Sequence, residues 1–167
     1  MDDELNLIAE QVGATLKAHG MMLGTAESCT GGWVGEVVTS VAGSSHWYDR
    51  GFITYTNESK QEMLGVSAST LAEYGAVSEQ TVREMAAGAL KHSHAHITLA
   101  ISGIAGPGGG TPNKPVGTVC MAWATRSGGG LSKTFHFQGD RAEVRRQAVV
   151  AALLKVLQII EGEAATA

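Results

Sequence analysis

One glycine-rich turn constrains this chain more than any other stretch. Residues 25–33 read TAESCTGGW and stand between two apolar patterns. Upstream, residues 20–24 end one helical pattern and open a short buried strand, and downstream Val34, Val37 and Val38 recur at helical spacing. The stretch therefore predicts a strand, a tight turn and a helix. Such a turn gathers small side chains and free backbone N–H groups at a helix start, where negative charge is stabilised.

Two interpretations of this turn stay open on its residues alone. In the first, Ser28 is a nucleophile, and N–H groups near Thr30 and Gly31 supply an oxyanion site. In the second, Ser28 or Thr30 only caps the following helix, a position that serine and threonine both favour.

The chain is long enough for one domain with a substantial core. It has 167 residues, of which 44% are hydrophobic and 17% charged, and 22 glycines indicate many tight turns. We expect a single domain over residues 1–167, with residues 161–167 as a frayed tail.

Charge and hydropathy exclude several classes of partner. The formal net charge of −4 gives no basic footprint for nucleic acid. No apolar run approaches the roughly 20 residues of a membrane span, and the acidic start at Asp2 is unlike a signal peptide. We therefore expect a cytoplasmic protein, in which Cys29 and Cys120 form no disulfide.

The remaining pattern alternates helices and strands. Asp2 or Asp3 is expected to cap a first helix that stops at Gly20, and Asn57 to cap a short one ending at Leu64. Further helices are expected from Ser67 or Ser69 to Tyr74, after Ser78, and after Asp140, and strands over residues 50–56, 97–101, 116–125 and 131–137. This order predicts an α/β fold, a three-layer α/β/α domain with a mixed parallel/antiparallel sheet and a pocket at the strand ends.

Lys60 is the best partner for Ser28 in the sequence. A serine hydroxyl needs a base to become a nucleophile, and a lysine serves if burial keeps it neutral. Lys60 follows the strand expected at residues 50–56, although most lysines simply point to water. Tyr55 either presents its hydroxyl to the same place or is a half-buried aromatic of the sheet.

A second glycine-rich loop follows the strand at residues 97–101. It reads SGIAGPGGG and matches no phosphate-binding signature. Ser102, Gly103, Ala105 and Gly106 could still offer backbone N–H groups to a phosphate or carbonyl oxygen. The competing interpretation is a wide turn.

Two arginines share a face at the start of the final helix. Arg141 and Arg145 are four residues apart and could clamp a phosphate. Solvated pairing with Asp140 and Glu143 is the ordinary alternative.

Two other types of site have weak support. Cys29 suggests a thiol hydrolase, but no histidine and carboxylate spacing supports it. His92, His94 and His96 alternate, yet no carboxylate or thiol follows at ligand spacing, so we expect no metal site.

Taken together and in order, the motifs resemble the CinA C-terminal-domain family over nearly the whole chain. They are TAESCTGG at residues 25–32, the segment from Gly51 to Lys60, GAVSE at 75–79, SGIAGP at 102–107, KPVGTV at 114–119, and GDR at 139–141 with Arg145. The resemblance implies a nicotinamide-nucleotide amidase that needs no metal or other cofactor. It also implies the stand-alone form of the family, without the additional N-terminal domain that some members carry.

The resemblance assigns roles to three residues. Ser28 would be the acylated nucleophile, Lys60 its general base, and Tyr55 a group that orients Ser28 or shuttles a proton. The reaction would convert nicotinamide mononucleotide (NMN) and water to nicotinate mononucleotide and ammonia, in pyridine nucleotide recycling.

The remaining contacts are hypotheses built on that reaction. N–H groups near Thr30 and Gly31, or from the loop at residues 102–106, would hold the oxyanion, and Arg145 with Arg141 would bind the nucleotide phosphate. We expect a homo-oligomer with a small-molecule nucleotide as substrate. The alternative function is a non-catalytic nucleotide-binding or competence-related interaction module that uses the same pocket.

Overall fold

A five-stranded mixed sheet forms the centre of the molecule. The computed structural model describes residues 2–166, with the side chains of residues 2–162. The strand order is β2-β1-β3-β4-β5. The strands are β1 (Leu23–Glu27), β2 (Tyr48–Ile53), β3 (Ile97–Gly103), β4 (Thr118–Thr125) and β5 (Gly130–His136). β1 is parallel to both β2 and β3, whereas β3, β4 and β5 pair antiparallel.

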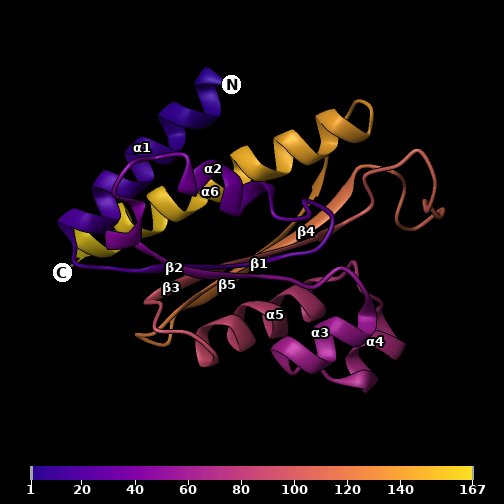
Figure 1. The fold of residues 1–167 in the computed structure, drawn as a ribbon. Coiled ribbons are helices and arrows are strands. Elements are labelled where there is room, and N and C mark those ends of the chain that lie inside the picture. The colour runs from indigo at the N-terminus through magenta and orange to yellow at the C-terminus, as the bar shows by residue number, and fades with distance from the viewer. Residues whose placement is uncertain (1, 167) are drawn as a thin grey trace.

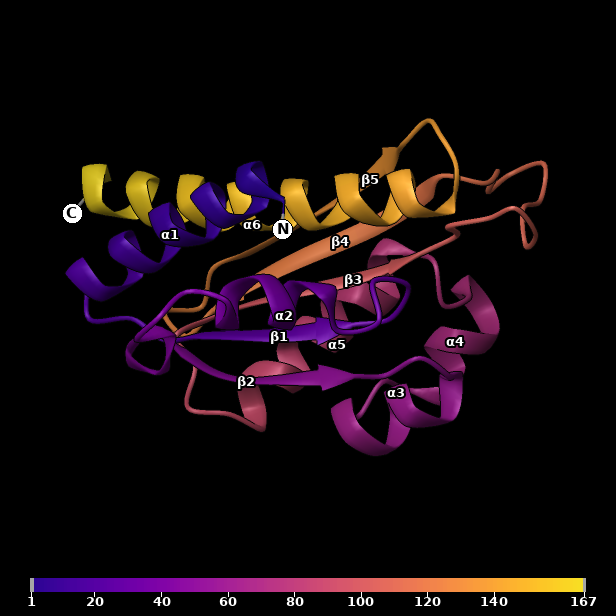
Figure 2. The same cartoon turned by 45° about the horizontal axis from the view of Figure 1, so that its top comes forward.

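Helices cover both faces of the sheet, which confirms the predicted three-layer α/β/α fold. They are α1 (Asp3–Ala18), α2 (Trp33–Thr39), α3 (Asn57–Leu64), α4 (Ala68–Tyr74), α5 (Glu79–Lys91) and α6 (Arg141–Thr166), with a 3₁₀ turn, η1, at Ser44–His46. Figures 1 and 2 show α1, α2 and α6 on one face and α3, α4 and α5 on the other. Residues 161–166 of the expected tail belong to α6, and residue 167 lies outside the described residues.

The apolar residues that recur along the sequence pack into two hydrophobic cores, one on each face of the sheet. On one face the buried stripe of α1, formed by Leu5, Ile8, Val12 and Leu16, packs with α2, α6 and the sheet. On the other face α5 supplies Val82, Met85, Ala86 and Ala89. β3 lies between the two cores, so it is apolar on both sides and reads as a continuous run.

The end of β2 differs from the prediction in a way that shapes the site. The strand ends at Ile53 and not at residue 56, because the carbonyls of Thr54 and Tyr55 accept hydrogen bonds from a lysine side chain. The cap of α3 is Thr56 and not Asn57, since Thr56 Oγ1 accepts from Ser59 N at 3.1 Å. The chain therefore turns straight from β2 into α3.

No helix within residues 2–166 has the length and apolar character needed to span a lipid bilayer.

Candidate active site

The turn after β1 is built on left-handed glycines. Ser28 N donates to Ile101 O at 3.0 Å, which ties the start of the turn to β3, and Gly31 N donates to Ser28 O at 3.0 Å. Gly31 and Gly32 have φ angles of 59° and 104°, a region that side chains with a Cβ rarely adopt. The glycines therefore allow the chain to reverse within a few residues and to leave Ser28 at the strand end.

Glu27 holds the inner side of this turn. Its Oε1 accepts from Thr30 Oγ1 at 2.6 Å and from Val34 N at 2.9 Å, and its Oε2 accepts from Gly35 N at 3.1 Å. A buried carboxylate thus satisfies the free N–H groups at the start of α2. The interpretation of Ser28 or Thr30 as the helix cap is therefore wrong, because Gly32 occupies the N-cap position and the acceptor for the first N–H groups is the side chain of Glu27.

Arg145 holds the outer side of the turn. Its Nε donates to Cys29 O at 3.0 Å and its Nη2 donates to Thr30 O at 3.2 Å. The guanidinium also lies 5.5 Å from the centroid of the Trp33 ring, a cation–π contact. The structure thus places the arginine that was expected at a phosphate against the backbone of the turn after β1.

Lys60 reaches Ser28 from α3, the helix that follows β2. Its Nζ lies 2.9 Å from Ser28 Oγ, 2.7 Å from Thr54 O and 3.2 Å from Tyr55 O. The Lys60 side chain is 1% exposed and Ser28 is 8% exposed. The pair that sequence spacing suggested is therefore in direct contact at the carboxyl end of the parallel strands.

The surroundings of Lys60 disfavour its charged form. Burial lowers the pKa of the Lys60 ammonium below its ordinary value, and the contacts of Nζ are all uncharged oxygens. A lysine in such a place has an increased neutral fraction at a given pH, and the neutral amine can accept a proton from a hydroxyl.

The backbone carbonyl and the side chain of Tyr55 make different contacts. Its carbonyl oxygen lies within hydrogen-bonding distance of Lys60 Nζ and 3.5 Å from Ser28 Oγ. Its side chain is 59% exposed, and its hydroxyl accepts from Arg141 Nη2 at 3.2 Å. Tyr55 is therefore not a half-buried aromatic of the sheet, because β2 has already ended before it.

Arg141 joins the two loops beside the pair. Besides Tyr55, its guanidinium binds the glycine-rich loop, with Nη1 donating to Gly106 O at 2.9 Å. A cavity of about 180 Å³ lies next to these contacts. Its lining residues are Ser28, Cys29, Tyr55, Lys60, Ala76, Val77, Ser102, Gly103, Ala105 and Arg141. Four other residues expected at the substrate do not line this cavity, although each is next in sequence to a lining residue or bonded to the turn beside it. They are Thr30, Gly31, Gly106 and Arg145.

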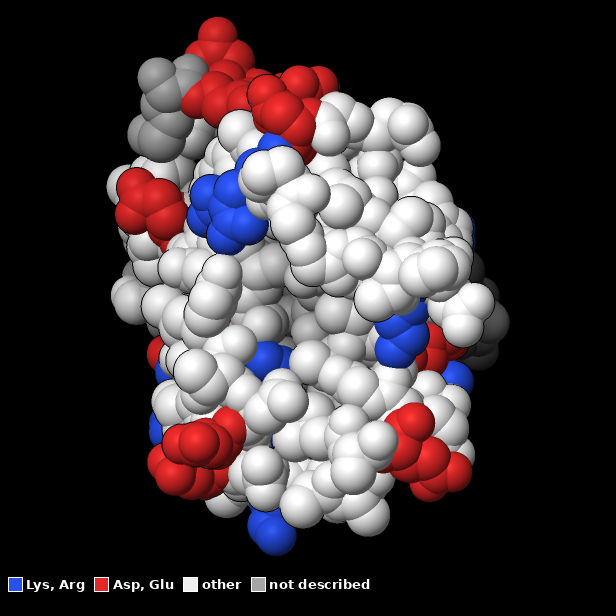
Figure 3. All heavy atoms as spheres, turned by 90° about the vertical axis from the view of Figure 1, so that its right-hand side faces the viewer, with Lys and Arg blue, Asp and Glu red and all other residues white. Residues whose placement is uncertain are grey.

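Among the described residues, four basic side chains without a carboxylate partner lie at this end of the molecule. Lys60, Lys114, Arg141 and Arg145 make no ion pair with a carboxylate in the described part of the chain, whereas Arg50, Arg83 and Arg146 do. Figure 3 views the molecule from this end, with basic side chains bordering the central hollow and most acidic ones nearer the outline. Lys114, Arg141 and Arg145 therefore bring positive charge to this end of a chain that is acidic as a whole.

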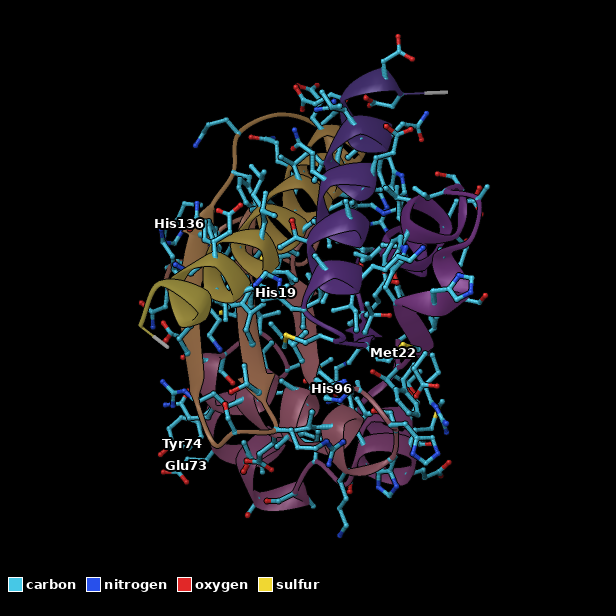
Figure 4. All side chains as sticks on the ribbon, turned by 90° about the vertical axis from the view of Figure 1, so that its left-hand side faces the viewer. His19, Met22, Glu73, Tyr74, His96 and His136 are labelled. Carbon is cyan, nitrogen blue, oxygen red and sulfur yellow. The ribbon has the colours of Figure 1, made fainter. Side chains whose placement is uncertain are left out.

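Neither the thiols nor the histidines form a competing site. Cys29 is 6% exposed, and burial raises the pKa of its thiol to about 11, so the thiolate is scarce. Both cysteines are free thiols. Among the described residues, no group of three or more His, Cys, Asp or Glu side chains could hold a metal ion. His96 instead accepts a hydrogen bond from Met22 N at 2.9 Å (Figure 4).

The sequence suggested Glu27 or the loop backbone at Ala105 as a partner for the ribose, but it missed the role of Glu27 as acceptor at the start of α2 and the carbonyl of Thr54. Glu27 carries a usable signal, because a carboxylate directly before a glycine-rich turn can neutralise the start of the next helix. The Thr54 carbonyl carries none, since its direction follows from where β2 ends.

Removal of the Glu27 carboxylate is expected to loosen the turn. Glu27→Ala leaves two buried donors and one partly buried donor without an acceptor and should lower the free energy of unfolding by about 3 kcal/mol. Thr30→Val removes only one of these bonds and should cost about 1 kcal/mol. Urea unfolding of both variants checks the order, and equal losses would show that the carboxylate does not organise the turn.

Comparison with known proteins agrees with the fold and the motifs. Residues 5–160 match the family model described as the CinA C-terminal domain. The chain is 56% identical over 157 residues to the nicotinamide-nucleotide amidohydrolase PncC of Escherichia coli, covering 94% of this chain and 95% of that protein. It is 45% identical to the protein of the same name from Pseudomonas putida, covering 94% and 98%.

A solved structure has the same fold over nearly its full length. The competence/damage inducible protein CihA from Agrobacterium tumefaciens superposes with a TM-score of 0.92 and 42% sequence identity, covering 96% of this chain and 98% of that chain. The family model, the relatives and this structure agree with one another, and the chain belongs to the CinA C-terminal domain family.

Proposed function

We propose that this protein hydrolyses the amide of NMN to give nicotinate mononucleotide and ammonia. The observation that carries the proposal is the 2.9 Å contact between Ser28 Oγ and a buried lysine amine at the edge of a cavity. The names of the relatives from Escherichia coli and Pseudomonas putida support nicotinamide-nucleotide amidohydrolase activity. The cations around the cavity favour an anionic nucleotide over free nicotinamide.

In the first half of the proposed reaction, the neutral Lys60 amine takes the hydroxyl proton of Ser28. Ser28 Oγ then bonds to the amide carbon, and the carbonyl oxygen becomes an oxyanion. When the carbon–nitrogen bond breaks, Lys60 returns the proton to the leaving nitrogen, which departs as ammonia. The nucleotide is left as an ester on Ser28.

In the second half, water replaces ammonia. Lys60 accepts a proton from the water molecule while its oxygen attacks the ester carbon, and the ester bond to Ser28 Oγ breaks. The proton then returns from Lys60 to Ser28 Oγ, so the enzyme is regenerated, and the carboxylic acid that is formed loses its remaining proton to water.

Backbone groups of the turn are the proposed oxyanion donors. The N–H of Gly31 is already bound to Ser28 O, which weighs against it. The N–H of Thr30 makes no hydrogen bond within residues 2–166, and it points away from Arg145 because the peptide plane sets it opposite the Cys29 carbonyl. We therefore assign it the stabilisation of the oxyanion, with N–H groups of the loop around Ala105 as a second source.

The other site residues receive positioning and binding roles. Arg145 fixes the carbonyls of the turn and so the direction of the Thr30 N–H, while the Tyr55 carbonyl orients Ser28 and Lys60. Ala76 and Val77 supply an apolar wall for the pyridine ring, and Ser102, Gly103 and Arg141 complete the cavity around the amide.

The test is the release of both products by chelator-treated protein. NMN should yield ammonia and nicotinate mononucleotide in equal amounts, measured by a coupled ammonia assay and by chromatography. Binding of NMN without either product would contradict the proposal and would indicate a nucleotide-binding module.

The proposed serine mechanism and a thiol mechanism predict opposite effects of replacing Cys29. Because the raised pKa leaves little thiolate, Cys29→Ala should keep kcat within about threefold of the parent, and an alkylating reagent should inactivate the folded enzyme slowly. The measurement is NMN turnover of Cys29→Ala beside Cys120→Ala, which controls for the loss of a buried thiol. Loss of turnover in Cys29→Ala alone would revive the thiol mechanism.

A further inference from the structure

The cavity beside Ser28 is too small for a whole nucleotide. Its volume is about 180 Å³, whereas pockets that enclose small-molecule ligands usually measure about 300–1,000 Å³. The nicotinamide group can enter it, and the ribose and phosphate must then lie in an adjoining space. This step rests on the proposed function, since it takes NMN as the substrate.

A larger polar groove adjoins the cavity. It has a volume of about 660 Å³, and Val77 lines both spaces. The floor is continuous as well, because Ser102 in the cavity pairs across the sheet with Cys120, and Cys120 pairs with Thr134 in the groove. Cross-strand partners share a face and lie about 5 Å apart. This row of three side chains therefore leads from Ser28 towards β5.

Two groups that can bind an anion lie beside this row. Lys114 Nζ donates to Tyr74 O at 2.6 Å and makes no ion pair in the described part of the chain. His136 is the cross-strand partner of Thr118, with its Nδ1 3.5 Å from Thr118 Oγ1. Figure 4 shows His136 on β5 and Tyr74 at the end of α4 on the same side of the molecule, one above the other. The groove thus passes between β5, which carries His136, and the end of α4, where the Tyr74 carbonyl holds the side chain of Lys114 from the β3–β4 loop.

Two acidic residues line the groove, and one of them, Glu79, is already satisfied, whereas Glu73 is exposed to solvent. Glu79 accepts hydrogen bonds from Ser132 Oγ and Thr134 Oγ1, both at 2.8 Å, and pairs with Arg83 at 3.5 Å. Its charge is therefore balanced at the β5 side of the groove, and Lys114 keeps an unpaired charge at the side of Tyr74.

We propose that this groove binds the ribose 5′-phosphate portion of the nucleotide, with Lys114 and His136 contacting the phosphate. Arg141 then has a different role. Its guanidinium already bridges Gly106 O and the Tyr55 hydroxyl, and it closes the opposite side of the cavity. The groove therefore selects the phosphorylated substrate, while Ser28 and Lys60 act on its amide.

The test compares two product ligands, so that no turnover intervenes. Nicotinate mononucleotide and nicotinate riboside differ only in the phosphate, and titration calorimetry gives the ratio of their dissociation constants. The parent should prefer the mononucleotide, and Lys114→Gln should reduce that preference at least tenfold, as expected for the removal of a charged hydrogen bond. Lys114→Arg should restore most of it, and His136→Gln should cause a smaller loss.

The matched control is Lys133→Gln. Lys133 is on the same hairpin, but its Nζ lies 4.8 Å from the Phe135 ring centroid on the face covered by α6. It changes the net charge equally and should leave the preference unchanged. A merely structural role of Lys114 would weaken both ligands alike and leave their ratio intact, which would overturn the proposal.

Other outcomes are equally decisive. Loss of the preference in Arg141→Gln but not in Lys114→Gln would place the phosphate at the other side of the cavity and overturn the proposal. A parent with no preference for the mononucleotide would overturn it too. If the preference depends on Lys114 but NMN yields no ammonia, the phosphate site in the groove is supported and the proposed hydrolysis is contradicted.

Discussion

Replacement of Lys60 by methionine is expected to lower kcat for NMN by about 10²–10⁴-fold. The magnitude is that of a missing general base, because methionine fills the buried space but cannot accept the Ser28 proton. Steady-state ammonia release measures the loss. Substitution of Lys17, an exposed residue on α1, by methionine serves as the control and should leave kcat unchanged.

Lys60→Arg distinguishes a base from a fixed positive charge. Arginine keeps the charge but cannot be deprotonated in a protein, so this variant should be as inactive as Lys60→Met. In the parent, burial lowers the Lys60 pKa, and the neutral fraction therefore grows as the pH rises through that lowered value. The parent kcat/KM should rise with pH and then level off. Near-normal turnover of Lys60→Arg would rule out the base.

Replacement of Ser28 by alanine is expected to have a still larger effect. Without Oγ no ester can form, and kcat should fall by ~10⁴-fold or more, as for other serine nucleophiles. Because Ser28 Oγ contacts the Lys60 amine and alanine removes only this hydroxyl, NMN binding should persist while chemistry stops. Ammonia release and calorimetric binding of NMN together measure this separation. Ser127→Ala, at the exposed tip of the β4–β5 hairpin, is the matched control.

Retained turnover in Ser28→Ala would mean that water attacks the amide directly. Loss of both binding and turnover would instead point to collapse of the turn, and the unfolding midpoint of the variant separates these two causes. The backbone of Ser28 makes two hydrogen bonds, its N–H to Ile101 O and its carbonyl from Gly31 N; alanine preserves both, so we expect an unchanged midpoint.

Local pattern was sufficient for most of the fold. Apolar periodicity located α1 and α6, and the glycine-rich tip at residues 126–130 indicated the antiparallel hairpin of β4 and β5. The boundary at the end of β2 was wrong by three residues, because the Lys60 side chain competes there with the sheet for backbone carbonyls. Such a competition depends on a tertiary contact and leaves no mark in local sequence.

The candidate site shows the same division. The spacing of Ser28 and Lys60 suggested a pair, and the structure brings them into contact. The two arginines were grouped by helical periodicity, which places them on one face but does not say what that face meets. In the fold, Arg145 binds the carbonyls of the turn after β1 and Arg141 binds two loops, since α6 runs beside the strand ends.

The most direct test of the Ser28–Lys60 mechanism is to map the acyl group on the chain. The enzyme is quenched in acid during turnover of NMN, digested, and analysed by mass spectrometry. We expect the peptide containing Ser28 to gain the mass of the nucleotide acyl group as an ester on Ser28, and the Ser28→Ala peptide to gain none. An acyl group on Cys29, or turnover with no acylated peptide at all, would contradict the mechanism.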